Sequence, residues 1–493
     1  MLIIRRFLIG IWFFTLCFAG SSLRASTKEA PAAAEIPLTT QSPEARQLFL
    51  DGRAYRENWR LPEALQAWRA AAKKDPGFAL AHLYVSFYTP DPKEEASARA
   101  AARRLAPQAS RGEQLLVQWF AGAKEGNFVS AIAAINDVVE LYPKDKWLLF
   151  QAGRWMVLQR NREKGQSLLE RAHALDPDYT PALNQLGYLY ASYGPQFEKS
   201  FQMFEHYARL KPQEPNPQDS WAEVLRMAGE YNKALEHYRK ALKLDSKFFS
   251  SQLGIADTYA LMGDEPRARA EYEKAIQMAT NQRTQISYMA QLALTYVREG
   301  NHEMADQSYA KVAQLAHEMG MFDMEADCHR YMAMYAPDFG HAMAHLDAAE
   351  KVVREDHSMA AENLDLAFSR VLLIRAWRAA KAGKTSTIAG AVSDLQKLSS
   401  RNGSNLIRQN YHSAAGMLAL AQGKYPDAVS HLEEEDLFTH LIAMEQLALA
   451  YEKTGNQEEA TKLRAELKRS HLPSIEQVVV ADPMRDTATA AQR

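Results

Sequence analysis

His341 and His345 are the side chains whose spacing most plainly suggests chemistry. They stand four residues apart in the segment HAMAH, so a helix would place both imidazoles on one face, where they could bind a metal. Cys328 and His329 lie shortly before them and could complete such a site. The alternative is that the histidines lie on the surface or pack structurally, and that Cys328 is a buried, inert thiol. A metal-binding or enzymatic protein built on His341, His345 and Cys328 therefore stays open as the second hypothesis.

The sequence lacks the common catalytic motifs. It has no glycine-rich phosphate loop, no Gly-x-Ser-x-Gly elbow, no His-Glu-x-x-His helix and no Cys-x-x-Cys-His haem attachment. His302 and His317 each precede a glutamate, but neither has a second histidine four residues later. We therefore predict that the chain is not an enzyme and needs no cofactor.

Composition points to a helical protein whose net charge is close to zero. The 493 residues hold 58 Lys+Arg and 60 Asp+Glu, a net charge of −2, which does not favour nucleic acid as a partner. Hydrophobic residues make up 47% and charged residues 24%, as in globular proteins. Two cysteines exclude a disulfide framework and a four-cysteine zinc site. The 23 glycines and 20 prolines are few for a turn-rich β-protein.

The first 21 residues have the pattern of a secretory signal peptide. Arg5 and Arg6 precede an apolar run at 7–20. This run is shorter than the roughly 20 residues that a membrane-spanning helix needs. Small residues follow, so we expect cleavage after Ser21, with Ala25 as the second choice. The predicted location is periplasmic or secreted.

Two alternatives to a cleaved signal remain. The segment 1–23 could stay as an uncleaved membrane anchor, and Cys17 could mark a lipoprotein, although Phe14 departs from the expected pattern. Residues 22–43 are rich in Ala, Ser, Thr and Pro and are predicted to be a flexible linker. Residues 474–493 lack any helical period and are predicted to be a disordered tail.

An internal repeat of 34 residues decides the expected fold. The same residue types recur at this interval in the middle of the chain, and looser copies lie on both sides of it. The clearest pairs are Gly229 with Gly263, Ala234 with Ala268, Tyr238 with Tyr272, and Ala241 with Ala275.

This order of small residue, aromatic residue, turn glycine, alanine, aromatic residue, alanine and terminal proline resembles the tetratricopeptide repeat family. The resemblance covers the array 44–473 and is degenerate at 79–125 and 310–410, where residues 385–390 are expected to add a loop. It implies an all-α fold, a right-handed superhelical solenoid of antiparallel helix hairpins.

The pattern supports hairpins without the family name. Trp221, Val224, Leu225 and Ala228 follow the i, i+3, i+4, i+7 spacing of one apolar helix face. Gly229 then supplies a residue that can adopt the left-handed conformation at a helix end. One hairpin cannot bury both of its apolar stripes, so neighbours must stack into an array of about ten to twelve hairpins.

The resemblance also implies a non-catalytic scaffold that binds a peptide or protein segment in its concave groove, lined by the first helix of each hairpin. Phe49 and Arg53 stand where cochaperone members carry Lys and Asn, which argues against their role in binding chaperone tails. The partner's identity is left open. The predicted groove residues are Arg53, Arg56, Trp147, Phe150, Arg154, Asn184, Tyr188, Glu223 and Asp257.

The segment 146–159 carries two apolar stripes, and a single hairpin should bury only one of them. Leu149, Ala152, Gly153 and Met156 match the positions that pack inside a hairpin in the family. A second stripe is formed by Trp147, Phe150, Arg154 and Leu158. Aromatic residues beside an arginine are typical of interface hot spots. The alternative is that the two aromatic side chains pack on the preceding hairpin near Tyr142.

Charge is distributed unevenly along the array. Residues 44–111 hold 12 Lys+Arg and eight acids, so their net charge is +4, whereas residues 424–460 hold two lysines and nine acids, a net charge of −7. Solvated helix faces explain this pattern most simply. Self-association through ends of opposite charge is the alternative.

Overall fold

The computed structural model describes residues 35–57, 60–124, 127–159, 161–192, 196–355, 361–402, 404–434 and 440–483. The predicted signal peptide 1–21 and linker residues 22–34 lie outside these residues. Within the described parts of the chain, helix is the only regular secondary structure, and no helix there is both long and apolar enough to cross a bilayer. The all-α prediction is confirmed.

Helices follow one another along the chain, and short connections join them. They are α1 (Pro43–Glu57), α2 (Leu61–Lys74), α3 (Ala79–Tyr88), α4 (Pro92–Leu105), η1 (Ala106–Gln108), α5 (Arg111–Lys124), α6 (Phe128–Leu141), α7 (Lys146–Leu158), α8 (Arg162–Leu175), α9 (Thr180–Ser192), α10 (Phe197–Leu210), α11 (Pro215–Met227), α12 (Tyr231–Leu244), α13 (Phe249–Leu261), α14 (Glu265–Met278), α15 (Gln282–Arg298), α16 (His302–Glu318), α17 (Phe322–Tyr335), α18 (Phe339–Glu355), α19 (Ala361–Lys381), α20 (Thr385–Arg401), α21 (Asn405–Ala421), α22 (Tyr425–Leu432), α23 (Leu441–Thr454), α24 (Gln457–Arg469) and the π-helical turn η2 (Gln477–Ala481).

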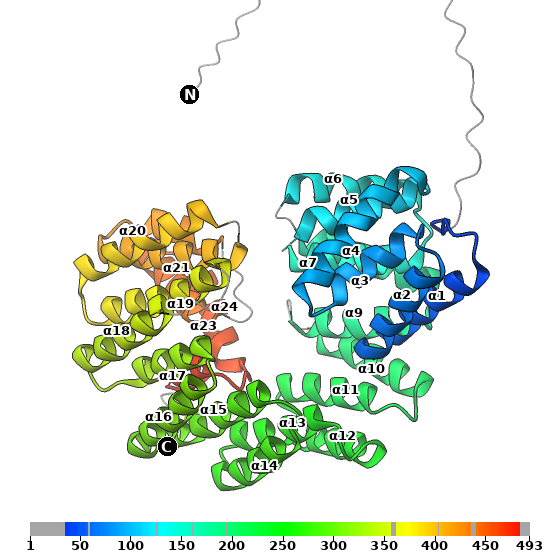
Figure 1. The fold of residues 1–493 in the computed structure, drawn as a ribbon. Helices are drawn as coiled ribbons and strands as arrows, with labels where there is room; N and C mark the ends of the chain where they lie inside the picture. Colours follow the sequence, from blue (N-terminus) through cyan, green and yellow to red (C-terminus); the bar gives the residue numbers. More distant parts are fainter. Residues whose placement is uncertain are drawn as a thin grey trace, which may run out of the picture.

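Each odd-numbered α-helix pairs with the next helix as an antiparallel hairpin, and the hairpins stack into the predicted right-handed solenoid. From α7 to α23, every odd-numbered helix also contacts the next odd-numbered one. These helices therefore form a continuous inner layer, and the even-numbered helices lie outside it (Figure 1).

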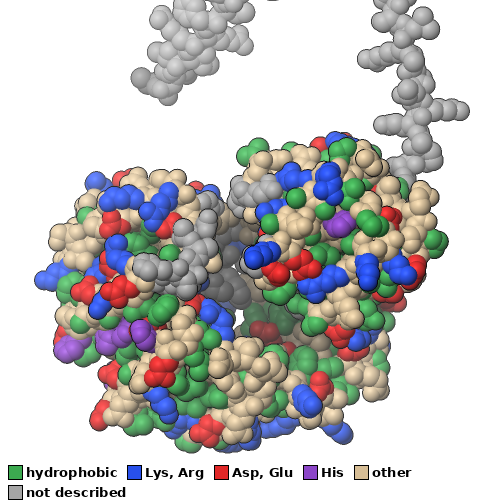
Figure 2. Space-filling model, viewed as in Figure 1, with side chains coloured by type: hydrophobic (Ala, Val, Ile, Leu, Met, Phe, Trp, Pro, Cys, Tyr) green, Lys and Arg blue, Asp and Glu red, His purple; other side chains and the backbone are tan. Residues whose placement is uncertain are grey.

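The array curls so that its two arms face each other. In Figure 1 the helices α1–α10 form the right arm, α16–α24 form the left arm, and α11–α15 run between them along the bottom. Figure 2 shows that the surface is hollowed between the arms in the same view. The inner layer lines this hollow, which places its side chains where a partner could meet several hairpins together.

Small residues beneath aromatic ones allow close packing within and between hairpins. A Cβ atom on Gly187 would lie 2.5 Å from the Phe204 ring in the hairpin of α9 and α10, and one on Gly254 would lie 2.2 Å from the Tyr238 ring of the preceding hairpin. Ala268 is fully buried and Tyr272 is 1% exposed, as the repeat register predicts. Gly229 adopts the predicted left-handed conformation, with φ of 79°, where α11 ends.

The predicted linker 22–43 is wrong in its last part. Ile36 and Leu38 are buried against the first hairpins. The backbone N–H of Ile36 donates to the Asp145 carboxylate at 3.0 Å, and that of Thr39 donates to Glu113 at 3.0 Å. Residues 35–42 thus cover the start of the array, because two aliphatic side chains in a polar segment suffice to anchor it.

The predicted disordered tail is also wrong for its first half. Residues 475–483 are helical, and Ile475, Val480 and Ala481 are buried. A segment without helical periodicity can still form a helix when surrounding helices supply its contacts. The remaining residues, 484–493, lie outside the described parts of the chain.

The degenerate stretches keep the hairpin architecture. Residues 385–390, predicted to be a loop, form the start of α20. Pro92 occupies the first position of α4, where the missing N–H costs nothing, and Asp91 caps this helix by accepting from the N–H of Lys93. Where the repeat length departs from 34 residues, the helices change in length and the hairpin fold is kept. Helix α19, for example, has 21 residues.

Candidate functional site

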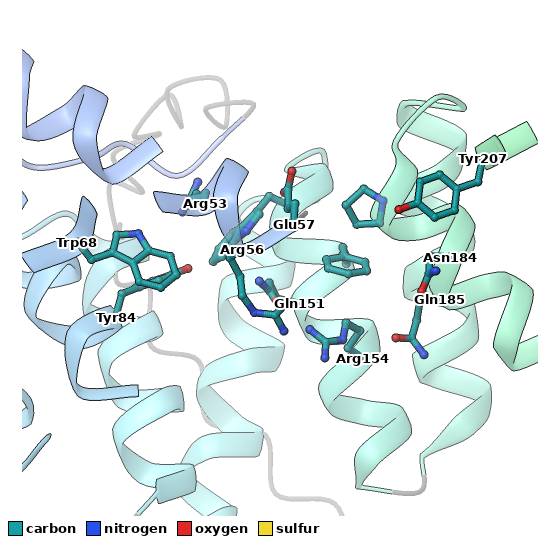
Figure 3. A pocket seen from close by; sticks show the side chains of 13 residues that line it. Arg53, Arg56, Glu57, Trp68, Tyr84, Gln151, Arg154, Asn184, Gln185 and Tyr207 are labelled. Atoms are coloured by element: carbon teal, nitrogen blue, oxygen red, sulfur yellow. The ribbon is translucent and has the colours of Figure 1, made fainter. Parts of the chain in front are cut away.

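A pocket on the inner layer of the right arm brings together six of the nine predicted groove residues. They are joined by seven others, mostly from α1, α7 and α9 (Figure 3). The lining residues are Arg53, Arg56, Glu57, Trp68, Tyr84, Trp147, Phe150, Gln151, Arg154, Pro181, Asn184, Gln185 and Tyr207. We call this site the arginine pocket.

Helix α7 supplies one wall because it carries two apolar stripes. Leu149 and Ala152 are fully buried, as predicted, and Gly153 lies so close to α8 that a Cβ atom would meet Leu169 at 2.7 Å. Asp145 fixes the helix start by accepting from the N–H of Leu148 at 2.9 Å. The second stripe, which includes Trp147, is thereby turned toward α1 and the pocket.

Arg53 of α1 lies over two aromatic rings. Its guanidinium carbon is 3.8 Å from the centroid of a Trp147 ring and 4.9 Å from that of Phe49. Such stacking stabilises a cation and limits its motion. The Nε and Nη2 atoms of Arg53 are buried and meet no hydrogen-bond acceptor among the described residues.

Arg154 has even fewer partners. Its guanidinium carbon lies 5.6 Å from the centroid of the Phe150 ring, and no acceptor among the residues that the structure describes forms a hydrogen bond or ion pair with it. Burial lowers the pKa of Arg154, and the positive charge of Arg56 lowers it further. In Figure 3, Arg56 and Arg154 point toward the same space beside Gln151.

Glu57 is the one acid among the lining residues, and it is already engaged. Its carboxylate accepts from the Tyr179 hydroxyl at 2.7 Å. Burial raises the pKa of Glu57, although this hydrogen bond and the charge of Arg53 oppose the rise. Three guanidinium groups thus face one carboxylate in a site that is partly screened from water.

The two aromatic residues of α7 are buried in the same apolar cluster as Tyr142, which is consistent with the alternative. Phe150 meets Tyr179 edge-on, with ring centroids 5.6 Å apart, and Trp147 lies 6.0 Å from the Tyr84 ring. Both side chains are 7% exposed, so they form the floor of the pocket rather than its open surface.

The three remaining predicted groove residues lie further along the inner layer. Tyr188 donates its hydroxyl proton to Glu223 at 2.8 Å, and the two join α9 to α11. Asp257 is instead buried inside the next hairpin, where it accepts from the Tyr272 hydroxyl at 2.6 Å. Its prediction as an accessible groove residue is wrong, because the aromatic residue of α14 reaches through to it.

Sequence reasoning missed Glu57, Gln151 and Gln185. Glu57 follows Arg53 by four positions, and Gln151 follows Trp147 by four. Helical spacing alone therefore places each of them beside a predicted groove residue. Nothing in the spacing within one helix could show that α1 and α9 meet over α7.

The candidate metal ligands do not form a cluster. His341 is exposed and pairs with Asp338 at 2.7 Å, whereas His345 lies beside His329, with ring centroids 5.9 Å apart. Cys328 is buried, and burial raises the pKa of its thiol to about 12. Among the described residues, no group of three or more His, Cys, Asp or Glu side chains could hold a metal ion.

Comparison with known proteins identifies the repeat. Residues 222–263 match the sequence profile described as TPR repeat, and residues 286–318 match the one described as tetratricopeptide repeat. This repeat is typical of protein–protein interaction scaffolds that are not catalytic. No curated protein sequence matches the chain at a significant level.

Several solved structures match parts of the chain at low identity. A tetratricopeptide repeat protein from Parabacteroides merdae is 15% identical, with a TM-score of 0.35, and the match covers 56% of this chain and 94% of that one. PilF of Pseudomonas aeruginosa is 15% identical over 41% of this chain and 97% of its own, with a TM-score of 0.30. YrrB, described as a TPR protein with an unusual peptide-binding site, is 16% identical over 37% of this chain and 92% of its own, with a TM-score of 0.28.

Proposed function

We propose that this chain is a non-catalytic interaction scaffold that holds an acidic segment of a partner protein in the arginine pocket. One observation carries the proposal. The pocket gathers Arg53, Arg56 and Arg154 against a single, already engaged carboxylate, and Arg154 has no protein acceptor among the described residues.

The charge balance favours an anion as ligand. Removing guanidinium groups from water without supplying acceptors is unfavourable. A ligand that brings hydrogen-bond acceptors offsets this desolvation and therefore binds favourably. A carboxylate fits the forked N–H groups of arginine and can take two hydrogen bonds from one side chain. Arg154 and the free donors of Arg53 suit such a group.

The setting of the pocket favours a protein segment over a small molecule. Its floor is aromatic, with Trp147 and Phe150, and aromatic residues beside arginines are common in the centres of protein interfaces. The inner layer continues beyond it through Asn184, which donates to Ser220 at 3.1 Å, and through Tyr188 and Glu223. An extended segment can therefore lie across several hairpins.

A peptide-display selection on the full-length protein tests this function. We expect enriched peptides to carry Asp or Glu and to bind the Arg154→Gln variant at least about ten-fold more weakly, as the loss of one charged hydrogen bond predicts. Arg171→Gln on the exposed face of α8 is the matched control and should bind normally. Selected peptides without acids, or equal binding to both variants, would refute the acidic ligand.

A second copy of the chain is one source of an acidic segment. Residues 424–460 hold nine acids against two lysines. Sedimentation velocity at low and high salt separates the sources, because a charge-driven oligomer dissociates as salt screens it. A monomer at all concentrations would leave another protein as the partner.

We also propose that the scaffold is exported. The support is the pattern of residues 1–21, with Arg5 and Arg6 before an apolar run. N-terminal sequencing of the mature protein should find Ser22 first. A mature protein that retains Met1 in the membrane fraction would instead support the anchored alternative.

A further inference from the structure

The C-terminal segment 471–483 returns onto the inner layer of the left arm. After α24 ends at Arg469, the chain turns back instead of extending the stack. Ile475, Val480 and Ala481 are buried in the same apolar cluster as residues of α15, α17 and α23. The concave face of the left arm is thus covered by the chain itself.

Both ends of this segment are fixed to helices distant in sequence. The Nδ1 atom of His471 lies 2.5 Å from the Tyr231 hydroxyl at the start of α12. Asp482 forms an ion pair with Arg298 at the end of α15, with a distance of 3.1 Å, and the Arg298 side chain is 8% exposed. The segment therefore spans the junction between the middle of the array and the left arm.

Glu476 caps a helix that has no cap of its own. The N-cap residue of α23, His440, makes no side-chain capping hydrogen bond. The Glu476 carboxylate accepts instead from the N–H of Ile442 at 3.3 Å. Burial raises the pKa of Glu476, while the N–H groups of α23 and the charge of Arg330 oppose the rise. A helix N-terminus stabilises a carboxylate in this position.

The segment leaves part of its groove unfilled. It holds a run of three valines, Val478–Val480, which disfavour helix, and it adopts a π-helical turn that is uncommon without external support. A cavity of about 260 Å³ remains between Ser474–Glu476 and the helices α15, α16 and α17. This pocket is partly open to solvent, so the segment does not seal the groove that it occupies.

We propose that the inner face of α15, α17 and α23 is a second segment-binding site, which residues 471–483 occupy in the absence of a partner. Its partner is a protein segment with the same chemistry: one carboxylate that caps α23, flanked by aliphatic side chains that replace Ile475 and Val480. The site is separate from the arginine pocket and does not depend on it.

The chemistry of this partner follows from the contacts of the resident segment. The N-terminus of α23 selects a carboxylate, as Glu476 now supplies, since its N–H groups and dipole favour negative charge. The aliphatic positions remove apolar surface from water, and the cavity beside Ile475 leaves room for a larger side chain there. A bound partner must displace the tethered segment, whose effective concentration is high because it belongs to the same chain.

Hydrogen exchange on the unmodified full-length protein tests the displacement. The probe is a synthetic peptide with the sequence of residues 470–483, added in large excess. We expect the peptide to accelerate exchange of the resident amides 475–483 at least about ten-fold, while α11–α14 keep their protection. A scrambled peptide is the control. Resident amides that exchange no faster with the peptide than without it would overturn the proposal, because the segment would then be part of the core.

A variant of the resident segment gives an independent measurement. In Glu476→Ala the carboxylate is lost, so the groove should be free more often and should bind the labelled wild-type peptide at least about ten-fold more tightly than the wild-type protein does. A peptide with the same Glu-to-Ala change should bind weakly to both. Equal affinity of the two proteins for the wild-type peptide would contradict the proposal, and so would a dimer by sedimentation, since the occupant would then be a second copy.

Discussion

The guanidinium group of Arg154 is largely removed from water, and no described residue accepts a hydrogen bond from it. Replacing Arg154 should therefore lower the affinity for the ligand much more than the stability of the fold. We expect Arg154→Gln to leave the melting temperature within about 2 °C of wild type, since no hydrogen bond or ion pair with a described residue is lost. Thermal unfolding by circular dichroism checks this. A fall as large as that of a core variant would show that Arg154 is structural.

Phe150 is a poorer probe of binding than sequence reasoning suggests. The residue is 7% exposed and packs on Tyr179. Phe150→Ala should destabilise the protein by about 3 kcal/mol, as large-to-small changes in cores do. Urea unfolding measures this loss. An unchanged midpoint would mean that the ring is free to engage a ligand.

Tyr272 separates packing from hydrogen bonding in one side chain. Tyr272→Ala removes a buried ring and should cost about 3–5 kcal/mol. Tyr272→Phe keeps the ring but leaves the buried Asp257 carboxylate without its donor, which should cost about 1–3 kcal/mol. Urea unfolding of both variants gives the two values, and equal losses would contradict this division.

Glu265 should make stability depend on pH. Burial raises its pKa to about 7, against the charge of Arg298, and its Oε2 atom has no hydrogen-bond partner among the described residues. A carboxyl whose pKa is higher in the folded state stabilises the fold at low pH and loses that contribution as pH rises toward 7. Glu265→Gln should therefore gain stability relative to wild type between pH 5 and about 8. A constant difference across this range would contradict the raised pKa.

At the scale of helices, the crossing of α13 and α14 depends on a small residue. Ala268 is fully buried, so Ala268→Leu should overpack the hairpin and cost about 1–3 kcal/mol. Because each hairpin contacts mainly its neighbours, limited proteolysis should increase within residues 230–310 and not elsewhere. Ala270→Leu, on the exposed face of the same helix, is the control. Equal proteolysis of the two variants would show that the register is wrong.

The hairpins were predictable because their signal is local. Gly229, Ala268 and Tyr272 recur at fixed spacing, and their roles depend only on the partner helix of the same hairpin. The two terminal segments were not predictable in this way. The aliphatic residues around Ile36 and Ile475 show no helical period, and their segments are ordered by contacts with other parts of the chain, such as the starts of α7 and α23.

In the candidate site, too, features within one helix could be predicted from the sequence, and contacts between distant helices could not. The stripe of Trp147, Phe150 and Arg154 follows from helical spacing within α7. Its contact with Arg53 depends on the curvature of the array, which brings α1 over α7 across several hairpins. Asp257 failed as a groove residue for the converse reason, since Tyr272 from the adjacent helix reaches it.

At the scale of the whole molecule, two concave faces differ in occupancy. The right arm presents the arginine pocket, and the left arm is covered by residues 471–483. Under the two proposals, the array combines an open site for an anionic ligand with a site that the chain occupies itself.

Site-specific photo-crosslinking in cells tests the central claim most directly. A photoreactive residue replaces Gln185 at the pocket, and the same residue replaces Ser167 on α8, outside the inner layer, as the control. We expect position 185 to capture a partner peptide rich in Asp or Glu, and the capture to be lost when Arg154→Gln is added. Capture that is equal at both positions, or that survives Arg154→Gln, would contradict binding of an acidic segment in the arginine pocket.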